Sequence, residues 1–354
     1  MSAEKLQEAR RQIEICNACR YCEGYCAVFP AITRQTAFAD GDITQLANLC
    51  HNCRGCYYAC QYTEPHEFAI NLPRVLAEVR TDSWRELAWP SGFAKAYDRH
   101  GVAMGAMTVL CLFFLILGAG SMRGAGDGEG FYQYLSHGFM VAIFAPAFIV
   151  PLLAMVISIR RYWRHVGGGA IGWIAMARAF HDVATLRNLG GGQDQGCNFE
   201  DEDRFSNARR IAHQLTLWGF LLCFASTSSA TVLHYAFDMQ APYGVFSLPK
   251  LFGVPGGLML SAGTFWMVVL KLQADGDLSD GRVRGGDMAF VLLLFAVSTS
   301  GLLLYAATYS GLVPYLLTFH LATVLTLFLT LPYSKFVHGF YRLAALLKNA
   351  RDAG

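Results

Sequence analysis

Eight of the eleven cysteines form two copies of one spacing, C-x2-C-x2-C-x3-C. Three thiolates at this spacing can bind three irons of a [4Fe-4S] cluster, while the fourth cysteine reaches the other cluster of a two-cluster module. The spacing therefore predicts two electron-carrying centres whose ligand sets cross between the runs. We assign Cys16, Cys19, Cys22 and Cys60 to one centre, and Cys50, Cys53, Cys56 and Cys26 to the other.

Structural zinc and disulfide bonds are the alternatives for these cysteines. Zinc sites are usually built from two short ligand pairs, so a doubled run with 2, 2 and 3 intervening residues favours iron and sulfur. Disulfides need an oxidising compartment. The polar opening MSAEKLQEAR shows no apolar signal segment, so we expect this region in the reducing cytoplasm. Ala27 and Gln61 follow the fourth cysteines where bacterial ferredoxins commonly have proline. We expect no cluster role for Cys111, Cys197 and Cys223.

Histidines at the ends of apolar runs form a second candidate set. A histidine in or beside a membrane helix is costly and is presumed functional. His213 and His234 bracket one run, and His320 and His338 belong to another. Eighteen residues make about five helical turns, which predicts that His320 and His338 share a face. The 21 residues between His213 and His234 are about 60° short of six turns, so these two are nearly aligned.

Pairing of these histidines follows from the expected helix directions. Three crossings separate the starts of the two runs, so the helices are predicted to be antiparallel. His213 then meets His338 near the cytoplasmic surface and His234 meets His320 near the opposite one, giving one or two sites for haem b with two imidazole ligands each. Interfacial histidines bonded to backbone or headgroups are the alternative. No C-x-x-C-H sequence occurs, which excludes covalent c-type haem. The reserve ligands are His100 and His137.

The elements that must hold these residues are membrane helices. The 354-residue chain is 54% hydrophobic and 15% charged, with a mean hydropathy of +0.33. About a quarter of the residues of a soluble protein are charged, and a helix of about 20 apolar residues crosses a bilayer. We predict six spans, at 101–120, 138–159, 214–237, 248–271, 288–308 and 313–333.

The predicted fold class is mostly α. Residues 1–95 are expected to form a ferredoxin-like domain with two [4Fe-4S] clusters, in which the cysteines lie on short loops between helices such as 3–15 and 71–87. Residues 96–354 are expected to form a cytochrome b-like bundle of six transmembrane helices, with a cytoplasmic loop at 160–210. That loop is too long for a simple connector. Two interpretations stay open on its composition: a segment that covers the inner haem or binds a partner, and a solvated amphipathic surface loop.

Basic residues indicate how the bundle is oriented. Lys and Arg are concentrated in the N-terminal domain, the 160–210 and 271–287 loops and the tail from Lys335, whereas the alternate loops hold little beyond Arg123 and Lys250. The positive-inside rule then predicts a multi-pass protein of the cell inner membrane whose iron–sulfur domain faces the cytoplasm. Because this charge reports topology and the formal net charge is only +2, we expect no nucleic-acid partner.

Motifs for two-electron chemistry are missing from the sequence. No Rossmann fingerprint follows a predicted strand, and neither a P-loop nor a nucleophile with triad partners can be identified. The chain thus carries one-electron groups and no assignable catalytic residue. We expect a flavin subunit on a separate polypeptide.

The chain resembles the tricarballylate or citrate utilization protein B family (TcuB/CitB) over nearly its whole length. The resemblance lies in CNACRYCEGYCAVFPA, LANLCHNCRGCYYACQYTEPHEFAINLPR, TLRNLGGG with GCNFEDEDRFSNARR, and LTLPYSKFVHGFYRLAALLK. It implies a membrane-bound iron–sulfur and haem protein that reoxidises the FADH2 of a tricarballylate dehydrogenase, the A subunit, and passes the electrons to the membrane quinone pool. The eight cysteines carry over by motif position, whereas the histidines rest on helix geometry alone.

Other functions stay open on the sequence. The same relay could serve a different flavin dehydrogenase or a heterodisulfide-reductase-like complex. A tricarboxylate transporter would need cationic residues deep in the membrane, which the spans almost lack away from their ends. A membrane-anchored redox sensor would leave the paired histidines unexplained. The leading prediction is therefore an electron-transfer subunit of an oxidoreductase that reduces quinone.

Overall fold

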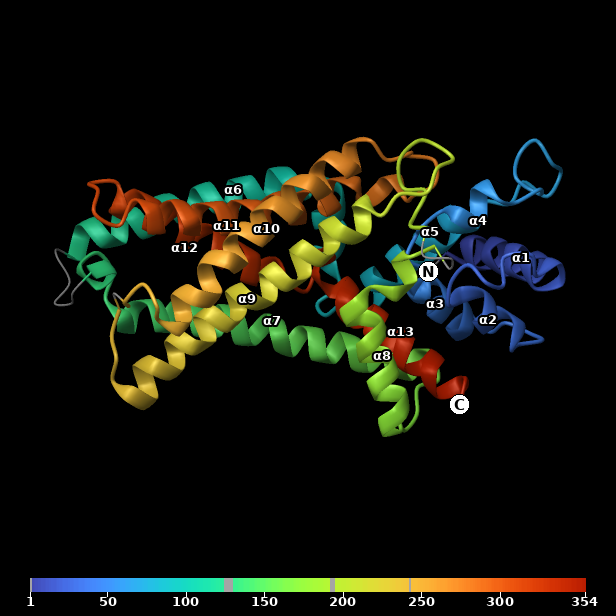
Figure 1. Ribbon diagram of the computed structural model, residues 1–354, viewed down its shortest axis with the longest axis horizontal. Helices are drawn as coiled ribbons and strands as arrows, with labels where there is room; N and C mark the ends of the chain where they lie inside the picture. The colour runs from blue at the N-terminus through green and yellow to red at the C-terminus, as the bar shows by residue number, and fades with distance from the viewer. Residues whose placement is uncertain (1, 124–129, 192–194, 242) are drawn as a thin grey trace.

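The structure, a computed structural model, describes residues 2–123, 130–191, 195–241 and 243–354. Within these ranges the regular structure is helical, and the β interactions are two isolated bridges, Cys197 with Ser206 and Glu200 with Ala274. The predicted mostly α fold class is confirmed. Figure 1 shows a long bundle with the small N-terminal domain at one of its ends.

Five short helices form the N-terminal domain: α1 (Ala3–Cys19), α2 (Val28–Thr33), α3 (Asp40–Leu49), α4 (Gly55–Tyr58) and α5 (Leu72–Leu87). Helices α1 and α3 both pack on α5 around buried residues such as Ile13, Leu46 and Leu76. Asn71 starts α5 by accepting a hydrogen bond from the backbone N–H of Arg74 at 3.2 Å, which satisfies one of the free donors of the first turn.

The first helix is longer than the sequence predicted. It continues from residue 15 to Cys19 and ends at Arg20, whose φ of 56° is left-handed. Cys16 and Cys19 therefore lie on the last helical turn, and Cys56 lies in the short helix α4, so the expectation that all the cysteines sit on loops is wrong for these three. A spacing of three residues is compatible with one helix face, so the ligand spacing and the helix do not conflict.

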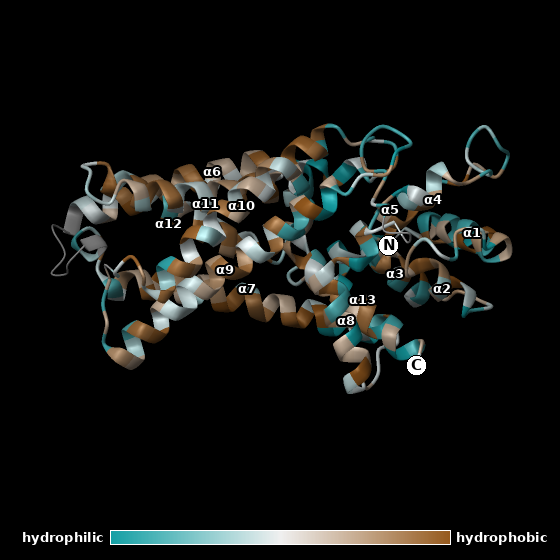
Figure 2. Cartoon of the chain, in the orientation of Figure 1, coloured by the Kyte–Doolittle hydropathy of each residue, from teal (hydrophilic) through white to brown (hydrophobic). Residues whose placement is uncertain are grey.

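Six helices among the described residues are long and apolar enough to cross a membrane. They are α6 (Gly92–Arg123), α7 (His137–His165), α9 (Ala208–Phe237), α10 (Leu248–Leu272), α11 (Arg284–Ala306) and α12 (Val313–Thr330). Their apolar colouring contrasts with the polar N-terminal domain in Figure 2. Large apolar side chains such as Phe114, which is 65% exposed, point outward, as lipid contact requires. The predicted six spans are confirmed, and they fit a multi-pass membrane protein.

The remaining helices lie in the connections and at the C-terminus. They are η1 (Gly130–Gln133), α8 (Trp173–Thr185), η2 (Arg187–Leu189), η3 (Gly281–Val283), η4 (Lys335–Val337) and α13 (His338–Asp352). Helix α13 packs on α8 and on α3, so the C-terminal helix joins the N-terminal domain (Figure 1). The 160–210 region thus contains the end of α7, helix α8 and the start of α9.

A break separates α12 from α13. Helix α12 ends at Thr330, and a turn with Pro332 precedes η4. Proline lacks an N–H and disfavours the helical conformation in the residue before it. His320 and His338 consequently lie on different helices, and the prediction that they share one helix face is wrong.

Close contact between α9 and α10 depends on glycine. A Cβ built on Gly263 would lie 2.7 Å from the backbone nitrogen of Thr216, and one on Gly219 would lie 2.5 Å from that of Leu260. Gly256 is similarly close to the backbone of Cys223. Small residues let membrane helices approach closely, and this contact fixes α9, which carries His213 and His234.

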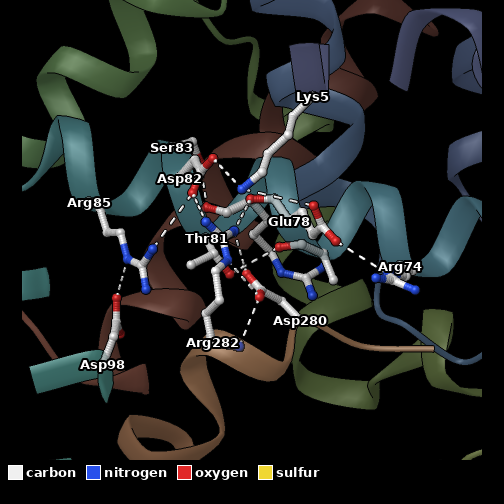
Figure 3. Close-up of polar contacts among 12 residues, drawn as sticks. Lys5, Arg74, Glu78, Thr81, Asp82, Ser83, Arg85, Asp98, Asp280 and Arg282 are labelled. Carbon is white, nitrogen blue, oxygen red and sulfur yellow. Dashed lines mark hydrogen bonds and ion pairs between the residues drawn. The ribbon is translucent and has the colours of Figure 1, made fainter. Parts of the chain in front are cut away.

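An ion-pair network connects the N-terminal domain to the bundle (Figure 3). Asp82 on α5 accepts from Lys5 on α1 at 3.2 Å and from Arg282 in η3 at 2.9 Å. Arg282 also binds Asp280 at 2.7 Å. A further ion pair, Arg85 with Asp98, joins α5 to α6. The domain is therefore held against the membrane helices by charged contacts of α5 with η3 and with α6.

Candidate iron–sulfur and histidine sites

The outer cysteine site is a cavity of about 260 Å³ at the far side of the N-terminal domain. Burial, followed by the neighbouring Cys60, raises the pKa of Cys16 and of Cys22 to about 12. Cys19 and the adjacent Tyr21, which is 69% exposed, lie open to solvent. The cysteines that line this outer cavity are Cys16, Cys19, Cys22, Cys56 and Cys60.

The inner cysteine site lies on the side of the domain that faces the membrane helices. It is a small cavity beside His51 and Arg54, and its cysteine Cys53 is only 8% exposed. Because Cys56 lines both cavities, the two sites adjoin. The cysteines of the inner site are Cys26, Cys50, Cys53 and Cys56.

The two cavities group the eight free thiols into crossed sets that share Cys56. Cys60 of the second run lies with the first run, and Cys26 of the first run lies with the second. In the described part of the chain, no group of three or more His, Cys, Asp or Glu residues is arranged to bind a single metal ion. Thiolates of a [4Fe-4S] cluster each bind a different iron, so this donor set fits a cluster better than structural zinc.

The segment around residues 196–200 closes the inner site from the bundle side. The backbone N–H of Asn198 donates to the carbonyl of Cys53 at 2.9 Å, and Arg54 donates to that of Phe199 at 2.7 Å. Cys197, buried and donating to the carbonyl of Leu189 at 3.1 Å, lies close enough to act on the pKa of Cys53. The long connection therefore contacts the second cysteine run, a contact that the sequence did not predict.

Arginines surround the backbone of the inner site. Arg80 on α5 and Arg342 on α13 both donate to the carbonyl of Cys50, at 2.9 and 3.0 Å. Arg209 on α9 donates to the carbonyl of Asn52 at 2.7 Å. None of the three forms an ion pair with a carboxylate of the described ranges. Positive charge near a cluster stabilises its reduced state.

His51 also belongs to this surrounding shell. Its Nδ1 is hydrogen-bonded to the carbonyl of Leu49 at 2.8 Å. Burial, with a contribution from Arg342, lowers the pKa of His51 well below its ordinary value. The imidazole is therefore neutral at pH 7 and adds no charge to the site.

The inner histidine pair comes from α9 and α13. The ring centroids of His213 and His338 lie 5.9 Å apart, with an interplanar angle of 72°. His338 is hydrogen-bonded through Nδ1 to the carbonyl of Lys335, and the buried Nδ1 of His213 has no partner. A metal lies about 2 Å from an imidazole nitrogen, so two rings that share one have centroids about 6 Å apart. The spacing fits a bis-imidazole haem.

At the opposite end of the bundle His234 is paired differently from the prediction. Its ring stacks on His137 of α7, with centroids 4.2 Å apart, and His137 is hydrogen-bonded to Tyr235 at 3.0 Å. His320 instead contacts the hydroxyl of Ser300 on α11 at 3.0 Å. The predicted pairing of His234 with His320 is therefore wrong.

Helix depth explains this correction. His234 lies three residues from the end of α9, whereas His320 lies seven residues into α12. Four residues of difference place His320 about 6 Å deeper in the bundle. His137 begins α7 at the same end as His234, so the reserve ligand is the one that the structure brings to His234.

Sequence reasoning missed three residues that shape these sites: Arg342, Arg80 and Cys197. Arg342 could have been found from its spacing to His338. It follows His338 by four residues and so shares its helix face. Arg80 and Cys197 are remote in sequence from what they contact, so no local pattern identifies them.

Comparison with known proteins gives a consistent result. The family model described as citrate utilization protein B matches residues 99–354, and that of the citrate utilization protein B Fer4-like domain matches residues 9–86. A relative from Escherichia coli, citrate utilization protein B, is 41% identical over 348 residues, covering 96% of this chain and 91% of the relative. No solved structure matches the chain.

Proposed function

Because the chain belongs to the citrate utilization protein B family, we propose that it is the membrane electron-transfer component that reoxidises the FADH2 of a partner tricarballylate dehydrogenase and reduces the quinone pool. Two [4Fe-4S] clusters on the eight cysteines and haem b on the paired histidines would supply the one-electron carriers. The order of the sites carries the proposal: an exposed cysteine site, a buried one, and then a histidine pair at the edge of the membrane helices.

The direction of electron flow follows from exposure. A soluble flavin partner can approach the outer site, where Cys19 and Tyr21 are exposed. The inner site is covered by the segment at 196–200 and by α13. A quinone dissolved in the bilayer can approach the membrane helices. The protein's own contribution is to hold these carriers in line and to exclude water from the inner ones.

For the histidines we propose one haem between His213 and His338. A second haem between His137 and His234 would require their stacked rings to separate, because 4.2 Å is less than the roughly 6 Å that a shared metal requires. His320, bonded to Ser300, is assigned no haem.

For localisation we propose the cell inner membrane with the N-terminal domain in the cytoplasm. The support is the excess of Lys and Arg in the segments at the domain end of the bundle. That side holds the N-terminal domain, the described parts of the connection before α9 (166–191 and 195–207), the 273–283 connection and α13. The division of the chain near residue 95 stays a prediction, because α6 begins at Gly92 and continues beyond that point.

The test couples the purified partner to this protein in nanodiscs that contain a short-chain quinone. With tricarballylate added, we expect the visible spectrum to show reduction of the haem. Quinol should then accumulate. Omission of the dehydrogenase is the control. Haem that stays oxidised while the partner turns over with an artificial acceptor contradicts the assigned partner. Uptake of labelled citrate by proteoliposomes without electron transfer would establish the transporter alternative instead.

A further inference from the structure

Arg342 lies between the inner cysteine site and the inner histidine pair. One end of its guanidinium, Nη2, donates to the carbonyl of Cys50 at 3.0 Å. On α13 it follows His338 by four residues, so the two share a helix face. The charge of Arg342 acts on both His338 and His213, which places it near the pair that we propose for haem.

The same guanidinium has a buried donor with no partner. Its Nε is inaccessible to solvent and makes no hydrogen bond, although buried donors are nearly always satisfied. The hydrogen bond of Arg342 is to a backbone carbonyl, and the carboxylate whose charge acts on it, that of Asp287, is already bound by Lys335 and Lys271. A buried charge without a counter-ion is costly. An anion from outside the polypeptide is therefore expected on the Nε side.

Comparison with the neighbouring cationic side chains favours Arg342 as the residue that binds this anion. Lys335 is also near the pair, but its amine is bound to Asp287, as is that of Lys271. Arg209 uses Nη1 on the carbonyl of Asn52 and stacks over Phe199, with its Cζ 4.3 Å from the ring centroid. Among these groups Arg342 is the one that combines a buried free donor with a place on the face of His338.

We infer that Arg342 binds a propionate carboxylate of the haem held by His213 and His338, and so links that haem to the carbonyl of Cys50 in the inner cluster site. This inference rests on the proposed function. Haem b carries two propionates at one edge, and a guanidinium binds carboxylates through strong charge-assisted hydrogen bonds. The carbonyl of Cys50, in the inner cluster site, already accepts a hydrogen bond from Nη2 of the same guanidinium.

Two consequences follow from this bridge. The positive charge stabilises the reduced states of both the haem and the inner cluster. Arg342 also provides a chain of hydrogen bonds from a cluster ligand to the edge of the haem. The outer cluster, with Cys19 open to solvent, lies beyond this influence.

The experiment measures haem release from purified protein to apomyoglobin, together with redox titrations of haem and clusters. For R342M we expect release about tenfold faster than for the natural protein, equivalent to about 1.4 kcal/mol. The midpoint potentials of the haem and of one cluster should fall, while the other cluster is unchanged. R342K keeps the charge and should restore the potentials. The matched control is R351M on the same helix, because Arg351 pairs with Asp352 at the surface.

A chemical comparison isolates the propionate. Haem dimethyl ester lacks the carboxylate charges of the propionates. The natural protein should therefore release the ester faster than it releases haem, whereas R342M should release the two at the same rate. This double cycle measures the coupling between Arg342 and the propionate. The ester comparison on the natural protein alone provides the test if R342M does not assemble.

The outcomes separate the two claims. Natural protein without any haem contradicts the proposed function itself. Natural protein with haem, in which R342M and R351M release it equally fast, overturns the role of Arg342 alone. An R342M effect that persists with the ester assigns the buried Nε to a different anion, such as a lipid phosphate, and also overturns the inference.

Discussion

Cys60 and Cys26 are the residues on which the iron–sulfur assignment depends most. Each belongs to one cysteine run in the sequence and to the other cavity in the structure. If each cavity holds a cluster, the crossed ligands would make the two runs one folded unit, because neither cluster could assemble from a single run. The α1, α3 and α5 core around Leu46 holds the runs in that relation.

Replacement of these two cysteines should therefore affect different clusters. In C60S we expect the outer cluster signal to be lost and the inner one retained, and in C26S the reverse, with about four non-haem irons lost in each case. Electron paramagnetic resonance with iron analysis measures this. C111S, at an exposed free thiol, is the control. Loss of the same signal in both variants would show that the ligands do not cross.

The histidines give a second prediction at this scale. H213A and H338A should each remove the same haem, because one metal cannot keep two imidazole ligands when either is absent. H320A should keep the full haem complement, since His320 is bonded to Ser300. The reduced-minus-oxidised spectrum measures this, with H181A at the surface as control. Haem loss in H320A would reinstate the pairing of His234 with His320.

Local spacing explains what the sequence predicted at this scale. The cysteine sets were predictable because the ligands of each run lie within eleven residues. The pairing of His234 was not, because it depends on the depth at which three helices end. Pro332 in LTLPYSKFVHGF was the available signal for the helix break, but the apolar residues on both sides of it continue the pattern of a single span.

Helix α9 connects the two histidine pairs, since it carries one member of each. Its position depends on the glycine contacts with α10. Hydropathy predicted all six spans because the bilayer thickness fixes their length. It contained no information on which spans touch, since glycine contacts are a property of paired faces.

Filling one of these contacts should disturb the haem sites without touching them. In G263V the new side chain meets the backbone of Thr216, and we expect a loss of about 1–3 kcal/mol in stability with reduced haem content. G105V is the matched control, because a Cβ there meets open space. Thermal unfolding in detergent compares the two. Equal stability of both variants would contradict the importance of this contact.

The junction between domain and bundle should be sensitive to acid. Burial alone would raise the pKa of Asp280, but hydrogen bonds from Arg282 outweigh burial and lower it. A lowered folded-state pKa contributes stability above the unfolded value of about 4 and loses it as pH falls through the folded pKa. We expect the melting temperature to fall below about pH 4 and D280N to weaken this dependence. D277N, at an exposed carboxylate, is the control. An unchanged acid profile in D280N would contradict the role of this network.

At the scale of the whole molecule, the C-terminal helix α13 joins the two halves. It begins with His338, reaches the carbonyl of Cys50 through Arg342, and packs on α3 of the N-terminal domain. The segment at 196–200 makes the second connection, through Cys53. The inner cysteine site and the inner histidine pair are therefore held by a shared set of backbone contacts. The sequence predicted both halves but not this joint, because its contacts span up to 315 residues, as between Arg34 and Asn349.

The most direct measurement is the content of haem and non-haem iron per polypeptide in detergent-purified protein, with the reduced-minus-oxidised spectrum of the same sample. An electron relay predicts about eight non-haem irons and at least one b-type haem, which is lost in H213A and in H338A. About eight irons with no haem would contradict the membrane half of the relay and leave the clusters as the last carriers.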